Sequence, residues 1–215
     1  MSRFCMTLAL SLILCVGLLG GQAVWAKGEK PGVFDYYVAA FSWSPSWCAR
    51  VGDDRGVDQC DDRHDYGFIL HGLWPQNERG WPSYCPTDLD APTASVLEGM
   101  VDIMGSTGLA RHEWKKHGVC SGMSVDGYFE HSRRAYELIN LPRAMRDLKI
   151  SPATVERAII DANPTLEPDG VTVTCRDGYI AEVRICLTRD LEPRACAPDA
   201  RRDCRAGPLK MPAVR

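Results

Sequence analysis

Apolar and polar positions follow two different periods along this chain. Aromatic and β-branched residues dominate at 34–43 (FDYYVAAFSW), and a short apolar run follows at 66–70 (YGFIL). Both stretches predict buried strands. Two more strands are predicted at 171–175 (VTVTC) and 179–187 (YIAEVRICL), joined as a hairpin through the Asp-Gly step between them.

A helical period replaces this pattern in the middle of the chain. Helices are expected at residues 93–104, 110–117, 125–140 and 152–162. Ser151 is the expected N-cap of the last helix, with Pro152 in its first turn, and Gly118 ends the second. Pro, Gly and Asp are frequent at 44–65 and 77–92, which predicts loops. The mixture predicts one α+β domain, an antiparallel β-sheet with helices packed on one side.

The N-terminus has the pattern of an export signal. An apolar run at about 6–20 is followed by small residues that end at Ala26, the expected cleavage position. A retained membrane anchor is the alternative, but the run falls short of the roughly 20 apolar residues that a span needs. We therefore expect residues 1–26 to be removed. A single domain at 27–215 would then be periplasmic or secreted, with no membrane contact.

Cysteine is frequent in the part of the chain that would remain. Two of the ten cysteines, Cys5 and Cys15, lie in the expected signal, which leaves eight. An even number in an exported chain predicts disulfides, here four, although eight cysteines allow 105 pairings. Structural zinc is the alternative, but the C-x-x-C pairs typical of such sites do not occur in the sequence.

The overall charge gives no sign of a broad basic surface. The chain carries a net charge of −3, which becomes −4 once Arg3 leaves with the signal. A polyanionic partner would therefore have to bind at a local site and not through the bulk charge of the protein.

His71 is the first candidate for chemistry. It follows the predicted strand at 66–70 within HGLWP, so we expect it at the C-terminal end of that strand. A histidine there is often only a partly buried structural residue, and HGLWP alone is moderately specific. Gly72 and Pro75 are interpreted as structural, allowing close backbone approach and a defined turn.

Two more histidines occur in RHEWKKHGVC at 111–120, which lies in a predicted helix. With His112 as the origin of a helical wheel, Lys116 lies about 40° away. Glu113 and His117 follow at about 100° and about 140°. Two imidazoles, a carboxylate and an ammonium thus share one face, which suits proton transfer and the binding of an anion.

Two other interpretations compete with a catalytic face. A solvated helix with Glu–Lys pairs is common. A zinc site of the H-E-x-x-H type needs histidines at i and i+4, whereas His112 and His117 are at i and i+5. The i+4 position holds Lys116, whose ammonium opposes a divalent cation. We therefore expect no metal.

Together, the two stretches resemble the two active-site segments of the ribonuclease T2 family, acid-type endoribonucleases of microbes, plants and animals. The strand predicted at 34–43, followed by a cysteine, resembles the family's first strand. YFEHSRRAYE at 128–137 resembles its long helix after the second segment. The likeness runs from residue 34 to about 204 and is looser outside the two motifs. The chain is identified as an exported bacterial member of this family.

The resemblance implies roles within the two motifs. The implied catalytic residues are His71, His112, Glu113, Lys116 and His117, and the implied substrate-binding residues are Trp43, Trp74 and His112. His71 and His117 resemble the acid–base pair; which of them is the base stays open, with a preference for His117. His112 resembles the phosphate-binding histidine, and Glu113 with Lys116 resembles the pair that stabilises the charged transition state.

The chain also departs from the family's pattern. It has Ser42-Trp43 where many plant and fungal members have Gln-Trp, and the loop after Trp74 differs as well. That Gln is usually counted among substrate-contacting groups, so base preference does not carry over from those members.

A set of disulfides is implied by the resemblance. The implied pairs are Cys85–Cys120, the nested pairs Cys175–Cys204 and Cys186–Cys196, and the remaining local pair Cys48–Cys60.

The implied activity is that of a metal-independent endoribonuclease without a cofactor. It would cut single-stranded RNA with low base specificity, through 2′,3′-cyclic phosphates to 3′-phosphate ends, leave DNA intact and act as a monomer. A non-catalytic secreted binding protein on the same fold is one rival, which the loss of a catalytic histidine would favour. A metal-dependent hydrolase is the other, and chelation would separate it.

Overall fold

A computed structural model describes residues 29–144, 146–205 and 207–215, so the expected signal at 1–26 lies outside the described residues. The strands are β1 (Tyr36–Trp43), β2 (Phe68–Gln76), β3 (Leu148–Ile150), β4 (Val171–Arg176), β5 (Tyr179–Leu187) and β6 (Leu209–Met211). The α-helices are α1 (Ser44–Trp47), α2 (Asp53–Arg55), α3 (Ala94–Glu98), α4 (Val101–Met104), α5 (Thr107–Lys116), α6 (Val125–Glu137) and α7 (Pro152–Ala162). Short 3-10 or π-helical turns are η1 (Cys48–Gly52), η2 (Asp58–Cys60), η3 (Gly118–Cys120) and η4 (Pro168–Gly170). None of the helices in these ranges is long and apolar enough to cross a membrane.

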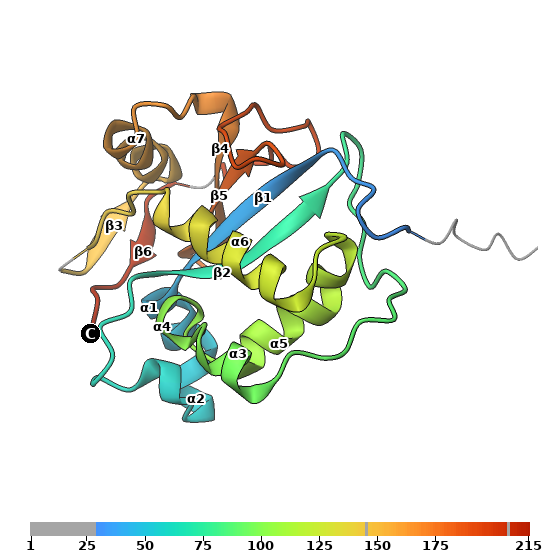
Figure 1. Cartoon of the computed structure of the whole chain (residues 1–215). Helices are drawn as coiled ribbons and strands as arrows, with labels where there is room; N and C mark the ends of the chain where they lie inside the picture. The colour runs from blue at the N-terminus through green and yellow to red at the C-terminus, as the bar shows by residue number, and fades with distance from the viewer. Residues whose placement is uncertain (1–28, 145, 206) are drawn as a thin grey trace, which may run out of the picture.

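The six strands form one sheet with the order β2-β1-β5-β6-β3, and β4 also pairs with β5. Figure 1 shows α6 lying across β1 and β2, with α3, α4 and α5 gathered beside β2. All strand pairs are antiparallel except β5 with β6, which are parallel and meet at Tyr179 and Lys210. The predicted α+β class is confirmed, with this one parallel pairing as an addition.

The two faces of the sheet differ in what covers them. On β1, Tyr37, Phe41 and Trp43 point into the main hydrophobic core, where they meet apolar side chains of α3, α4, α5, α6 and α7. Alternate residues of a strand point to opposite faces, so Val38 and Ser42 point away from this core. The helices therefore cover one face, and a cavity occupies the other.

Local signals predicted several elements correctly. β4 and β5 form the expected hairpin. α7 begins at Pro152, and the Ser151 hydroxyl accepts a hydrogen bond of 3.2 Å from the Thr154 amide. The helix α6 begins after Ser124, as expected, and Ser124 is its N-cap. The helix α5 begins at Thr107, before the expected start at residue 110, and its N-cap is Ser106. These caps satisfy amides that have no partner within the helix, which is why they mark its start.

Away from the two motifs, the fold differs from the sequence analysis in three places. The stretch at 44–65 is not an open loop, because it coils through α1, η1, α2 and η2. The helix predicted at 93–104 is divided into α3 and α4 at Gly99, a residue of low helix propensity. The strands β3 and β6 were missed, since three residues are too few to establish a period of two.

The strand β2 is longer than predicted, so the expectation that His71 ends a strand is wrong. Gly72 and Pro75 are poor strand residues, which made Leu70 look like the end. Pro75 is tolerated because β2 lies at the edge of the sheet and pairs only with β1.

A β-bulge at His71 sets the direction of its side chain. Across β1 and β2, Ala40 pairs with Gly72 and Phe41 pairs with Leu70, which leaves His71 as an extra residue without a partner. The extra residue shifts the alternation of side chains along β2 by one position. Leu70 and Leu73 therefore both face the core, and His71 and Trp74 both line the cavity on the opposite face.

Four disulfides reinforce the domain. They join Cys48 to Cys60, Cys85 to Cys120, Cys175 to Cys204 and Cys186 to Cys196. These are the pairs that the resemblance implied. The bond between Cys85 and Cys120 ties the segment before α3 to the turn after α5 and thereby anchors the C-terminal end of α5.

Candidate active site

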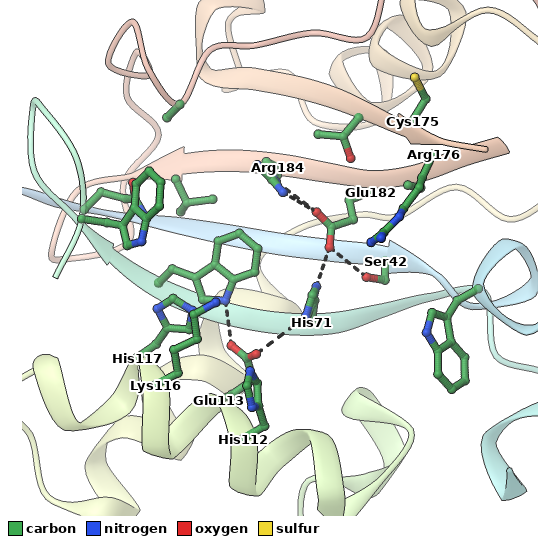
Figure 2. A pocket seen from close by; sticks show the side chains of 18 of the residues that line it. Ser42, His71, His112, Glu113, Lys116, His117, Cys175, Arg176, Glu182 and Arg184 are labelled. Atoms are coloured by element: carbon green, nitrogen blue, oxygen red, sulfur yellow. Dashed lines mark hydrogen bonds and ion pairs between the residues drawn. The ribbon is translucent and has the colours of Figure 1, made fainter. Parts of the chain in front are cut away.

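A cavity of about 610 Å³ lies over β1, β2, β4 and β5 and is bordered by α5. Its lining includes His71 and Trp74 from β2 together with His112, Glu113, Lys116 and His117 from α5 and its C-cap. Figure 2 shows His71 on the strand facing the side chains that α5 and its C-cap contribute, which are His112, Glu113, Lys116 and His117. The two sequence motifs therefore meet in one cavity.

The orientation of α5 follows from its cap and its apolar face. The Ser106 hydroxyl accepts a hydrogen bond of 3.1 Å from the Leu109 amide, which starts the helix. Ala110 and Trp114, four residues apart, are buried in the core. This anchoring leaves the polar face of α5 beside β2. His117 is the C-cap, and its amide donates to the Glu113 carbonyl at 2.8 Å.

Trp74 links the two motifs. Its indole Nε1 donates a hydrogen bond of 2.7 Å to Oε2 of Glu113. Its ring stacks on His117, with centroids 5.2 Å apart and planes inclined by 23°. His117 is only 3% exposed, and within the described part of the chain its Nδ1 has no hydrogen-bond partner. Stacking on the indole thus orients the His117 ring.

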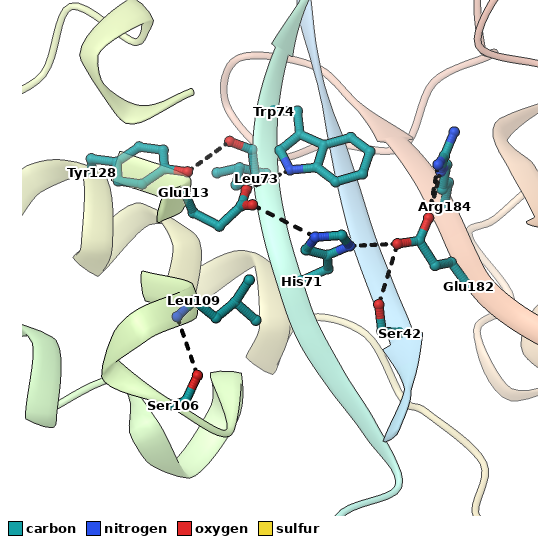
Figure 3. Close-up of polar contacts among 10 residues, drawn as sticks. All are labelled: Ser42, His71, Leu73, Trp74, Ser106, Leu109, Glu113, Tyr128, Glu182 and Arg184. Atoms are coloured by element: carbon teal, nitrogen blue, oxygen red, sulfur yellow. Dashed lines mark hydrogen bonds and ion pairs between the residues drawn. The ribbon is translucent and has the colours of Figure 1, made fainter. Parts of the chain in front are cut away.

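His71 lies between two carboxylates, as Figure 3 shows. Its Nδ1 donates a hydrogen bond to Oε1 of Glu182 on β5. Its Nε2 is 3.6 Å from Oε1 of Glu113. The Ser42 hydroxyl donates to Oε1 of Glu182 at 3.2 Å, and Arg184 donates to Oε2 from Nε at 3.0 Å and from Nη2 at 2.8 Å. His71 is therefore held in a network that extends over three strands.

The two histidines have opposite charge preferences. Burial lowers the pKa of His71, but the hydrogen bond and charge of Glu182 and the charge of Glu113 outweigh burial and raise the pKa overall. Burial, followed by the positive charges of Lys116 and His71, lowers the pKa of His117 to about 3. Burial also raises the pKa of Glu113 to about 7. Around neutral pH, one imidazole favours its proton and the other favours the neutral form.

Comparison with known proteins places this arrangement in a family. The model of the ribonuclease T2 family matches residues 34–196. This chain belongs to the ribonuclease T2 family. It is 52% identical over 110 residues to "Ribonuclease" of Aeromonas hydrophila and 33% identical over 120 residues to "Probable ribonuclease" of Haemophilus influenzae. The two matches cover 51% and 50% of this chain and 47% and 44% of those proteins, so the chain spans about half the length of these curated relatives.

The same fold occurs in a solved plant structure. The "RNase-related protein from Calystegia sepium" superposes with a TM-score of 0.67 at 21% sequence identity. The superposition covers 85% of this chain and 98% of that one.

Most residues implied by the ribonuclease T2 motifs lie in the cavity, but Trp43 does not. His112 is exposed, and it lines the cavity together with Lys116. Trp43 is fully buried on the core face, packs edge-on against Phe68 and donates from Nε1 to the Pro212 carbonyl at 2.8 Å. The expectation that Trp43 contacts substrate does not fit this position, and we leave it out of the site.

The sequence analysis missed several charged residues of this ribonuclease T2 cavity, among them Glu182 and Arg184 on β5. They alternate with Val183 and Ile185 in β5, so one face of a central strand carries charged side chains while the other is buried. This alternation in the sequence could have indicated that one face of the strand carries functional groups. Glu182 and His71 are 111 residues apart in the chain, and no local motif connects them.

Gly72→Ala is expected to lower the free energy of unfolding by about 1–3 kcal/mol, the usual cost of overpacking. A methyl group at Gly72 would overlap Oε2 of Glu113 and Nε1 of Trp74, the two atoms that form the hydrogen bond between the motifs. Urea unfolding measures the change. Gly207→Ala is the control, because an added methyl there meets no atom of the described residues within 4 Å. Equal stability of the two variants would contradict this packing.

Proposed function

We propose that this protein is an exported endoribonuclease that cleaves single-stranded RNA by acid–base transphosphorylation. The products are 2′,3′-cyclic phosphates and then 3′-phosphate ends. The observation that supports this most directly is that His71 and His117 line one cavity in opposite charge environments. One ring faces carboxylates and the other is surrounded by cations, so an acid and a base are present at the same pH.

The first step uses His117 as the base and His71 as the acid. Neutral His117 takes the proton of the ribose 2′-hydroxyl, and the 2′-oxygen forms a bond to phosphorus. The bond from phosphorus to the 5′-oxygen breaks as that oxygen takes a proton from His71. In the second step His71 takes a proton from water and the water oxygen forms a bond to phosphorus. The bond from phosphorus to the 2′-oxygen breaks as that oxygen takes a proton from His117, which leaves a 3′-phosphate.

Negative charge develops on the phosphate oxygens in both steps, and three groups on α5 are suited to stabilise it. Lys116 supplies a cation at the cavity, and a bound phosphate would favour the protonated form of His112. Glu113, whose burial raises its pKa to about 7, keeps its proton over most of the acid range. A protonated carboxyl there can donate a hydrogen bond to a phosphate oxygen.

Base recognition is proposed to be loose. Trp74 and Trp81 both line the cavity, and Trp81, which is 53% exposed, offers an indole face to a base. The ring of Trp74 stacks on His117 and has Arg184 over it, so it borders the base without a free face. Stacking on an aromatic ring tolerates any base, because every base has a π-face. Low base specificity is therefore part of the proposal.

Export and a monomeric state complete the proposal. Four disulfides suit an oxidising compartment, which agrees with an export signal at 1–26 and with a periplasmic or secreted protein. The reaction is complete with protein side chains and the substrate's own hydroxyl, so neither a metal nor a cofactor is invoked, and DNA is not a substrate.

The test is incubation of the purified mature protein with a single-stranded oligoribonucleotide in excess EDTA. We expect cleavage at an undiminished rate, with cyclic phosphate ends appearing first and 3′-phosphate ends later, as resolved by ³¹P NMR. Activity that is lost with EDTA and restored by zinc would support a metal-dependent hydrolase. Binding of RNA without any cleavage would support a binding protein.

The dependence of kcat/KM on pH is expected to be bell-shaped, with its maximum on the acid side of neutrality. His117 must be neutral, and since its pKa is lowered to about 3, activity rises as pH increases through about 3. His71 must be protonated, and since its pKa is raised, activity falls only above the ordinary histidine value of about 6.5. Glu113 interacts with His71, so the alkaline limb belongs to this pair. Initial rates on a dinucleotide measure the profile, and a maximum above pH 8 would contradict these assignments.

A further inference from the structure

Glu182 is a buried carboxylate on the face of the sheet that carries the cavity. It is 9% exposed, and both of its oxygens accept hydrogen bonds. A buried carboxylate is costly unless charged or polar partners compensate the loss of water. Here the partners are His71, Ser42 and Arg184, which come from three different strands.

Contact between His71 and Glu182 depends on the strand that separates them. β1 lies between β2 and β5, and neighbouring strands are about 4.8 Å apart, so the two residues must meet above β1. Ser42 of β1 pairs directly with Glu182, and Ala40 pairs with Arg184. Both β1 residues are small, which leaves room for the imidazole. The bulge in β2 aims the ring across this gap.

We propose that Glu182 is a positioning residue that orients the His71 ring and keeps it protonated, while Ser42 and Arg184 hold the carboxylate in place. Because Nδ1 donates to Glu182, Nε2 is the nitrogen that delivers the proton. The inference rests on the proposed function, in which His71 is the acid that protonates the leaving 5′-oxygen.

Charged groups act on His71 from two elements, β5 and α5. From β5 these are Glu182, which favours the imidazolium, and Arg184, which opposes it. From α5 the carboxylate of Glu113 favours the charged ring. The positive charge of His71 in turn lowers the pKa of His112 and of His117. The ammonium of Lys116 also lowers the pKa of these two histidines.

Of the two carboxylates, Glu182 is the one that stays ionised. Burial raises the pKa of Glu182, but the hydrogen bond and charge of His71 and the charge of Arg184 outweigh burial and lower the pKa to about 2. Burial raises the pKa of Glu113 to about 7 instead. Below neutral pH, where the acid must act, Glu113 is increasingly protonated and Glu182 alone supplies a full negative charge to His71.

The test is Glu182→Gln, with two readouts. NMR titration of the imidazole signals is practicable because the chain has only five histidines. Loss of an adjacent opposite charge should lower the titration midpoint of His71 by about one to three pH units. The alkaline limb of kcat/KM should move to lower pH by the same amount, with kcat falling roughly tenfold or more at pH 7 and KM changing little.

Three further variants sharpen the result. Glu182→Asp keeps the charge but shortens the reach, so it should preserve most of the midpoint while lowering kcat. Glu98→Gln, at an exposed carboxylate on α3, is the matched control and should change neither readout. Glu182→Gln leaves Arg184 without its carboxylate partner, so Glu182→Gln with Arg184→Gln is the fallback if the single variant does not fold, and it should still lower the midpoint.

An unchanged His71 midpoint in folded Glu182→Gln, in a protein that cleaves RNA normally, would overturn this inference and leave the proposed function standing. A lowered midpoint in a protein whose wild type cleaves no RNA would support the contact between Glu182 and His71 and overturn the proposed function. A rate loss that is equal at every pH, with no change in midpoint, would mean a merely structural role for Glu182.

Discussion

A DNA strand that carries one ribonucleotide is expected to break only at the bond immediately 3′ of that ribose. The new end should first be a 2′,3′-cyclic phosphate. In the proposed mechanism all nucleophilicity comes from the ribose 2′-hydroxyl, which DNA lacks. The hydroxyl of Ser42 lines the cavity but donates to Glu182, and the sulfur of Cys175 is in a disulfide with Cys204.

The effect should be all or none at the modified position, and gel analysis with mass spectrometry of the fragments measures it. A strand with a 2′-O-methyl nucleotide at the same place is the matched control and should stay intact. Single-stranded RNA should be cut, because its backbone can bring the 2′-oxygen in line with the departing 5′-oxygen. Duplex RNA should resist, since A-form geometry holds that oxygen out of line. Cleavage of all-DNA strands at a comparable rate would mean that water or a protein group is the nucleophile.

His117→Ala and His71→Ala are each expected to lower kcat by about 10²–10⁴-fold, the typical contribution of one general acid or base. Both variants should remain folded. Loss of the His117 ring removes a stack on Trp74 but leaves the indole bonded to Glu113. Loss of the His71 ring leaves Glu182 paired with Arg184.

Cleavage rates of the oligoribonucleotide, measured on samples quenched at timed intervals, report activity. Thermal unfolding of the same variants reports stability. His64→Ala is the control, because His64 pairs with Asp58 in a different segment and does not line the cavity. The double variant of His71 and His117 should be little slower than the slower single variant, since residues that act as a unit are not additive. A folded His117→Ala protein with wild-type turnover would refute the scheme.

Local physics made the helices and their chemistry predictable from the sequence. Ser151 with Pro152 predicted the start of α7, and Gly118 predicted the end of α5, because both signals act between residues a few positions apart. The wheel that placed His112, Glu113 and Lys116 on one side of a helix needed only the helical period, and all three line the cavity. The hairpin at β4 and β5 followed from its Asp-Gly turn in the same way.

The tertiary structure decided which face of the sheet each side chain points to. This depends on how strands that are distant in the sequence align. The sequence placed His71 at the end of a strand, whereas the pairing of β1 with β2 makes it a bulged residue inside one. The same alignment buries Trp43 on the core face, although its neighbour Ser42 faces the cavity. A shift of one residue in strand register turns every side chain to the other face, and register is set by the packing of the whole sheet.

The partner of His71 is the clearest case. Glu182 lies 111 residues away in the chain and across a third strand. Its contact with the ring exists because β1 lies between β2 and β5 and carries small residues there. The sequence determined which groups are available for proton transfer, since an imidazole is an acid or a base wherever it lies. Which form each imidazole favours was decided by the fold, because the pKa of a buried group follows the charges that tertiary packing brings within a few ångströms of it.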